Sequence, residues 1–202
     1  MTMREIVLDT ETTGLSPANG DRIVEIGCIE LVNHLPSGAV FHCHVNPEMA
    51  MPEAAQAVHG HSDEFLADKP KFAGIVSQFL EFIGDAPLII HNASFDMGFI
   101  NAELKLIDVP ALPMSRSVDT VSMARTKYPG QPASLDALCR RFNIDNSART
   151  VHGALLDASL LAEVYLELIG GRQPGLTLTA SAAAAGPETL QAAEAGAREA
   201  RA

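Results

Sequence analysis

The chain has 202 residues, 47% of them hydrophobic, which is enough for one domain with a complete core. The formal charge of −11 argues against tight, independent binding to long DNA duplexes, because phosphate contacts favour a basic surface. No apolar stretch approaches the roughly 18 residues of a membrane span, and the three cysteines have no paired spacing, so we expect no membrane association and free thiols in a reducing cytoplasm.

Strand and helix patterns alternate along residues 1–170. Runs of β-branched residues predict strands, apolar residues at helical spacing predict helices, and Pro, Gly and Ser mark several ends. Three hairpin strands followed by alternating helix and strand predict a mixed α/β sheet with helices on both sides. The expected strands are 4–9, 22–32, 38–45 and 87–92, and the expected helices are 52–60, 71–84, 95–107, 117–128, 134–144 and 153–170.

The composition changes after residue 170. Residues 171–202 are rich in alanine and glycine, which predicts a flexible tail attached to a single domain formed by residues 1–170. The charges of the tail cancel, so the acidity of the chain belongs to the domain.

Four acidic residues lie where predicted elements end or begin. Asp9 and Glu11 stand two apart at the end of the first strand and therefore point to the same side of the sheet. Asp96 lies where a buried strand gives way to a helix, and Asp157 lies about one turn into the last helix. Their surroundings are apolar, and a carboxylate near a core needs a compensating charge. Because the helix at 153–170 contains no Lys or Arg, divalent cations, which prefer oxygen ligands, are the simplest compensation.

Each of these residues also has an ordinary structural interpretation. Asp9 alone could cap a turn, Asp96 alone could cap a helix, and Asp157 alone could be a solvated helix residue. His152 lies just before the last helix, from where a loop imidazole can reach the carboxylates. Imidazoles titrate near neutral pH, which suits a general base. A lone histidine in this place is otherwise a surface or capping residue.

The segments DTETTG (9–14), HNASFD (91–96) and HGALLD (152–157) together resemble the three exonuclease motifs of the DEDDh family. Within that family the sequence is most similar to the epsilon, or proofreading, subunits of bacterial DNA polymerase III. The resemblance covers about residues 4–170 and implies a ribonuclease H-like fold, with a five-stranded mixed sheet flanked by helices. It also implies a 3′–5′ exonuclease that releases nucleoside 5′-monophosphates from DNA 3′ ends.

The resemblance implies two divalent ions, Mg²⁺ or Mn²⁺, between the carboxylates. Asp9, Glu11 and Asp157 would hold one ion, with Asp9 bridging to the second. Asp96 would act mainly on the second ion, partly through water. The ions would stabilise the attacking and leaving oxygens of the scissile phosphate, and His152 would take a proton from the attacking water.

Substrate contacts follow from the same resemblance. Thr12, Gly14 and Leu15 would meet the terminal nucleotide, with Leu15 against its base. His59 and Phe95 would lie beside that nucleotide. The alternatives are an ordinary turn for the first three residues, a helix-end histidine for His59 and a core position for Phe95.

Three other polar residues predict only structure. His42 and His44 lie two apart on one strand face, a spacing that can bind metal. Without an evident third ligand, we interpret them as part of a solvated strand face. Asp119 begins a helix as D-T-V-S and is expected to cap it.

The tail carries a short motif at residues 173–178. Gln173, Leu176 and Leu178 fit the pattern Gln-x-x-Leu-x-(Leu/Phe), which resembles the sliding-clamp-binding peptide of bacterial replication proteins. A plain linker is the alternative. The family further implies the polymerase III alpha subunit as a partner and a cytoplasmic, nucleoid-associated place in the replisome, although this tail lacks the aromatic anchor expected for polymerase binding.

Two other functions compete with proofreading. A stand-alone DEDDh nuclease acting on RNA or single-stranded DNA ends would share the motifs, because contacts to the 2′-OH cannot be read from them. A catalytically silent adaptor would bind a partner only. The intact acidic set and His152 argue against an adaptor, which has no need of all five residues.

Overall fold

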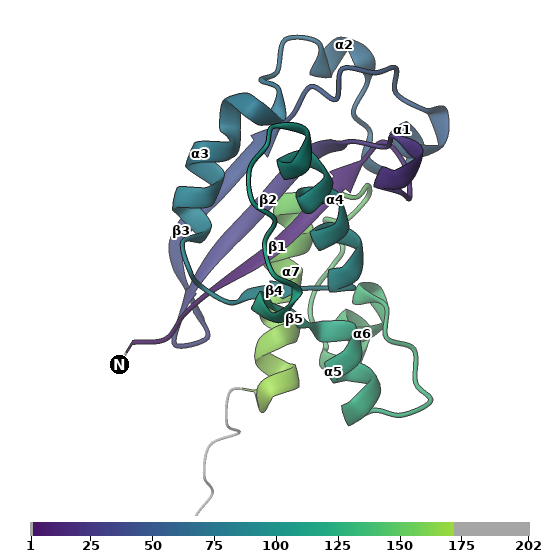
Figure 1. Cartoon of the computed structure of the whole chain (residues 1–202). Coiled ribbons are helices and arrows are strands. Elements are labelled where there is room, and N and C mark those ends of the chain that lie inside the picture. Colours follow the sequence, from purple (N-terminus) through teal and green to yellow (C-terminus); the bar gives the residue numbers. More distant parts are fainter. Residues whose placement is uncertain (1, 172–202) are drawn as a thin grey trace, which may run out of the picture. The chain divides into compact units, whose positions relative to one another are not determined.

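A five-stranded mixed sheet forms the centre of the chain, for which a computed structural model describes residues 2–171 (Figure 1). Strands β1 (Arg4–Thr12), β2 (Ile23–Val32) and β3 (Leu35–His44) form an antiparallel meander, as their turn-separated patterns predict. Strands β4 (Leu88–Ile90) and β5 (Ser117–Asp119) run parallel to β1. The spatial order β3-β2-β1-β4-β5 puts β1 in the middle of the sheet. The fold predicted from the family resemblance is confirmed.

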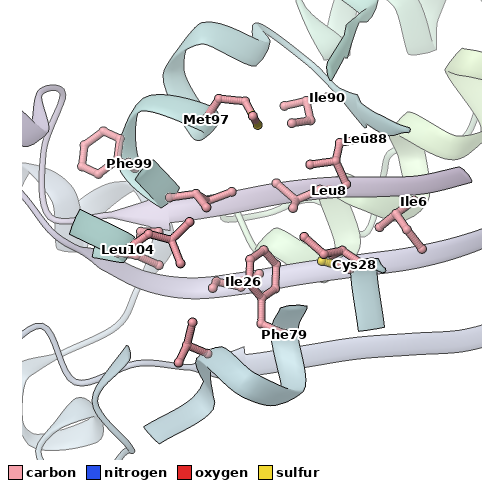
Figure 2. Packing of buried hydrophobic residues seen from close by; sticks show 14 of the residues in the cluster. Ile6, Leu8, Ile26, Cys28, Phe79, Leu88, Ile90, Met97, Phe99 and Leu104 are labelled. Atoms are coloured by element: carbon pink, nitrogen blue, oxygen red, sulfur yellow. The ribbon is translucent and has the colours of Figure 1, made fainter. Parts of the chain in front are cut away.

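Helices cover both faces of the sheet because the side chains of β1 alternate between two cores. Ile6 and Leu8 pack with Phe79 and Met97, which come from helices α3 (Phe72–Ile83) and α4 (Ala93–Leu106) (Figure 2). Val7 belongs to a second core with helices α5 (Thr120–Lys127), α6 (Leu135–Phe142) and α7 (Ala154–Ile169). Two short helices, α1 (Glu53–His59) and α2 (Asp63–Leu66), connect β3 to α3 in the chain.

One local prediction was wrong, and one short helix was missed. The helix expected at 117–128 begins instead with β5, whose three residues are too few to show a strand period in the sequence. Asp119 ends this strand and caps α5 as predicted, because its side chain accepts the amide of Val121 over 3.1 Å. The short helix α2 was not predicted at all.

Some predictions fall elsewhere in the chain. Gln173, Leu176 and Leu178, with the rest of the predicted tail beyond residue 171, lie outside the described residues. Among residues 2–171, none of the helices combines the length and the apolar character needed to cross a bilayer.

Gly27 on β2 allows α7 to approach the sheet. It pairs with Asp9 on β1, and a Cβ on Gly27 would lie 2.4 Å from the backbone of Ala154 and Leu155. The first turn of α7 therefore lies directly against the strand pair that carries Asp9. This contact brings Asp157, in the same turn of α7, close to the end of β1.

We expect Gly27→Ala to destabilise the protein by about 1–3 kcal/mol or more, because the added methyl group overlaps main-chain atoms that cannot rotate away. Thermal unfolding monitored by circular dichroism measures this loss. Gly98→Ala is the matched control, since a Cβ at this position in α4 meets open space and alanine favours helix by up to about 1 kcal/mol. Equal stability of Gly27→Ala and the unaltered chain would contradict the close approach.

Candidate active site

The structure brings together the carboxylates that the sequence singled out. Asp9 and Glu11 lie at the end of β1, Asp96 lies in the first turn of α4, and Asp157 lies in the first turn of α7. All four line one groove of 740 Å³, together with His152. The groove thus joins elements from the two faces of the sheet.

Asp96 is fixed by β1. Its Oδ1 atom accepts the backbone N–H of Thr10 over 3.0 Å and the Thr10 hydroxyl over 2.7 Å. Thr10 lies two residues after Leu8 on β1, so its side chain points to the same face of the sheet, which α4 covers. The two hydrogen bonds therefore attach the start of α4 to the strand that carries Asp9 and Glu11.

Crowding and burial raise the pKa values of three carboxyl groups. Burial, and next the charge of Asp96, raises the pKa of Asp9 well above its ordinary range. Burial, and next the charges of Asp157 and Glu25, raises the pKa of Glu11 to about 8. Burial raises the pKa of Asp96 to about 7, against the effect of the Thr10 hydrogen bonds. These groups resist ionisation unless a further positive charge arrives.

Arg149, on the loop before α7, supplies a positive charge that the sequence analysis missed. Its Nε and Nη2 atoms donate to the two oxygens of Asp157, each over 2.6 Å, and Nη1 donates to Asp136 over 3.2 Å. Helix 153–170 indeed contains no Lys or Arg, but the loop before it supplies Arg149, three residues before His152, which the sequence analysis did not consider.

His152 lies at the exposed rim of the groove. Its backbone amide donates to the carbonyl of Val58 over 3.0 Å, which attaches the loop to the end of α1. Its Nδ1 atom lies 2.9 Å from Nη2 of Arg149 and 3.5 Å from Oδ2 of Asp157. Because a guanidinium can only donate, Nδ1 is the acceptor in this contact.

The donor set fits hard divalent cations. Ligand atoms of Glu11, His152 and Asp157 all lie within 4.8 Å of one another, and Asp9 and Asp96 interact with the same group electrostatically. Carboxylate oxygens are the ligands that Mg²⁺ and Mn²⁺ prefer. A cation at this place would also relieve the repulsion that raises the carboxyl pKa values.

The turn after β1 borders the same groove. Thr12 donates its hydroxyl proton to the carbonyl of Gly14 over 2.6 Å, which closes the turn. A Cβ on Gly14 would lie 2.4 Å from the carboxylate of Asp21, so glycine leaves this space free for Asp21. Leu15 is 86% exposed. This large apolar side chain therefore stands in solvent at the entrance to the groove.

Two rings line the groove beside this turn. Phe95 packs against Phe99 with ring centroids 4.9 Å apart, so it also joins the core. His59 is buried at the end of α1, and its Nδ1 accepts the amide of His61 over 3.0 Å. Burial lowers the pKa of His59 to about 4, so its ring is neutral and carries the proton on Nε2. That atom is buried without a hydrogen-bond partner among residues 2–171.

Comparisons with known proteins identify the family. A family model described as "Exonuclease" matches residues 6–165. The chain is 58% identical over 174 residues to a protein named DNA polymerase III subunit epsilon from Rickettsia conorii, covering 85% of this chain and 76% of that protein. The protein of the same name from Escherichia coli is 48% identical over 176 residues, with coverages of 84% and 72%.

Solved structures share the fold. Exonuclease X, in complex with 5′ overhanging duplex DNA, aligns with a TM-score of 0.64 at 24% identity, covering 81% of this chain and 90% of that one. The nuclease domain of 3′hExo, a DEDDh family member bound to rAMP, aligns with a TM-score of 0.71 at 16% identity, with coverages of 83% and 92%.

We expect the raised carboxyl pKa values to destabilise the metal-free protein progressively as pH rises from about 4.5 to about 8. A carboxyl group with a raised folded-state pKa holds its proton longer in the folded state, which therefore binds more protons across this window. Glu11→Gln should remove part of the loss and raise the free energy of unfolding at pH 8 by on the order of 2 kcal/mol. Denaturant titrations in EDTA at pH 5 and pH 8 measure how much the free energy of unfolding changes between the two pH values. An identical change in the unaltered protein and in Glu11→Gln would contradict the repulsion.

We expect Arg149→Gln to destabilise the metal-free protein by about 3 kcal/mol, because it leaves the buried carboxylate of Asp157 without its partner. Calorimetry in EDTA measures the loss, and Mn²⁺ should restore most of it by supplying another positive charge. Arg141→Gln is the control, since Arg141 is a surface residue whose polar contacts among residues 2–171 are Gln131 and the Tyr128 ring, and this change should alter stability by less than about 0.5 kcal/mol. Equal losses in the two variants would refute the role of Arg149.

Proposed function

The chain belongs to the exonuclease family, in the group of DNA polymerase III epsilon subunits, and from this we propose that it proofreads DNA. In this proposal it hydrolyses the last phosphodiester bond at a DNA 3′ end and releases a nucleoside 5′-monophosphate. The observation that carries the proposal is the groove in which four carboxylates from β1, α4 and α7 meet beside an exposed histidine.

Asp9, Glu11, Asp96 and Asp157 would hold two divalent ions, Mg²⁺ or Mn²⁺. When bound, such ions polarise the scissile phosphate and lower the pKa of water. The protein positions the ligands from a rigid strand and two helix starts. The Thr10 hydrogen bonds keep Asp96 in place, and the close approach at Gly27 keeps α7 in place.

His152 is the proposed general base, and Arg149 controls its availability. While Nδ1 accepts a hydrogen bond from Arg149, a neutral imidazole carries its own proton on Nε2 and has no free lone pair. We infer that the contact between Arg149 and Nδ1 breaks before His152 can take a proton from the attacking water. The exposed His152 side chain is the partner with room to move, since the Arg149 side chain is largely buried and paired with Asp157.

The terminal nucleotide would lie along the turn after β1. The Nε2 proton of His59 points to no partner in the described chain and suits a sugar or phosphate oxygen. Leu15 and Phe95 would contact the base and the sugar through apolar area. Thr12 and Gly14 would set the path of the turn.

Partner proteins would supply the hold on DNA that this acidic protein lacks. A charge of −11 disfavours independent binding to long DNA, and attachment to the polymerase III alpha subunit would hold the DNA 3′ end nearby. The motif at Gln173, Leu176 and Leu178 would bind a sliding clamp. Both attachments would place the protein at the cytoplasmic replisome.

We expect the full chain with Mg²⁺ to shorten a 3′-mismatched DNA primer, and to act faster with the alpha subunit present. Asp157→Ala or Asp9→Ala should nearly abolish turnover with the fold intact, whereas Asp68→Asn, at an exposed position, should not. His152→Gln should lower kcat by roughly 10²–10⁴-fold while metal-induced stabilisation remains. Chromatography of released monophosphates measures the rates.

Normal turnover in the Asp157 variant would refute the assignment of the site. Faster digestion of a matched RNA oligonucleotide than of DNA would instead support a stand-alone RNA nuclease.

A further inference from the structure

Three histidines surround one glutamate outside the groove. Glu25 lies on β2, His42 and His44 lie on β3, and His61 lies in the turn between α1 and α2. We call these four residues the Glu25–histidine cluster. We propose that it binds a borderline transition-metal ion such as Zn²⁺, separately from the carboxylate site, with Glu25, His44 and His61 as ligands.

The side chains converge on one carboxylate. His42 Nε2 lies 2.7 Å from Oε1 of Glu25, and His61 Nε2 lies 2.7 Å from Oε2. His44 Nε2 lies 3.9 Å from Oε1. Ligand atoms of Glu25, His44 and His61 are all within 4.8 Å of one another. The sequence interpretation of His42 and His44 as a solvated strand face agrees with the exposure of His42, but the further ligands it did not find are supplied by the fold as Glu25 and His61.

The register of the sheet explains how the cluster forms. Glu25 pairs directly with His44 across β2 and β3, and His42 lies two residues further along the same face. His61 approaches from the loop that follows α1. The ring centroids of His44 and His61 are 4.8 Å apart, and Phe65 covers both rings from α2. Ligands from three separate elements thus face a common point.

The charge of Glu25 and the state of His44 favour a bound cation. Burial would raise the pKa of Glu25, but the hydrogen bonds from His61 and His42 lower it to about 2, so the carboxylate is ionised. Burial lowers the pKa of His44, against the opposing charge of Glu25 and with smaller contributions from His61, His42 and Lys69. A neutral His44 offers a nitrogen lone pair beside an ionised carboxylate, which is a metal-binding pair.

The ligand types select the metal. Two imidazoles and one carboxylate suit Zn²⁺ or Co²⁺, whereas Mg²⁺ prefers oxygen alone. Zn–N bonds of about 2.0–2.1 Å put tetrahedral ligand atoms about 3.3 Å apart. The proposed ligand atoms of Glu25, His44 and His61 all lie within 4.8 Å of one another. Side-chain movements on the order of 1 Å would therefore bring them to tetrahedral spacing, once the Nε2 proton of His61 leaves or moves to Nδ1.

His42 would then act through Glu25. Its Nε2 proton donated to Oε1 orients the carboxylate, as partners of metal-binding carboxylates do. A bound ion would also hold His61, whose amide donates to Nδ1 of His59. The metal would in this way fix the turn after α1 without entering the groove.

The test measures zinc bound by the full chain after chelation and dialysis against Zn²⁺ with a large excess of Mg²⁺. We expect one zinc per chain in the unaltered protein and in Asp157→Asn, which removes a charge from the carboxylate site. His44→Gln and His61→Gln should each weaken binding by at least about tenfold. His34→Gln is the matched control, because His34 also bonds a glutamate, Glu5, over 2.8 Å but belongs to no three-ligand group among residues 2–171.

Cobalt provides a second measurement on the unaltered chain. Four-coordinate Co²⁺ with imidazole ligands absorbs visible light much more strongly than six-coordinate Co²⁺ bound by carboxylates and water, so the Glu25–histidine cluster predicts a strong band. The proposal is overturned if no zinc binds, if the cobalt band is weak, or if Asp157→Asn loses zinc while His44→Gln and His61→Gln keep it. Circular dichroism and Mg²⁺-dependent nuclease activity verify that the histidine variants fold.

Discussion

The repulsion among carboxylates at the end of β1 is the constraint on which the rest of the structure depends. Side chains buried there are costly to ionise, and their raised pKa values express this cost. Several separate features reduce this cost or hold the carboxylates in place. Arg149 neutralises the charge of Asp157. Asp157 also lies in the first turn of α7, where the helix dipole stabilises a negative charge. Thr10 donates a hydrogen bond to Asp96. A polar site of this kind persists only because well-packed cores lie on both sides of the sheet.

The same face of the sheet carries two groups of side chains that could bind metal ions of different chemistry. Glu11 and Glu25 are direct partners across β1 and β2, yet Glu11 faces other carboxylates and Glu25 faces imidazoles. Oxygen-rich and nitrogen-rich sites select different ions, so close neighbours need not compete for the same metal. The negative charge of Glu25 nevertheless raises the pKa of Glu11, so the two sites are coupled electrostatically.

The sequence predicted the parts of the molecule that depend on local pattern. The spacing of Asp9 and Glu11 and the apolar alternation of β1 are local properties, and both correspond to the observed strand. Features that depend on distant packing were not predictable. Strand β5 is too short to show a period, and the contact between Arg149 and Asp157 depends on how the loop before α7 folds. Glu25, the carboxylate beside His44 in the Glu25–histidine cluster, likewise comes from β2 and is adjacent to His44 only through the sheet register.

Helices α4 and α7 lie on opposite faces of the sheet, and each contributes one carboxylate to the same groove. An ion bound by both would join the two cores through the central strand. Opening either layer would then require losing the ion, so partial unfolding of one face would become coupled to the other. Loading the site would convert two separately openable layers into one cooperative unit, with slower amide exchange and proteolysis throughout the sheet.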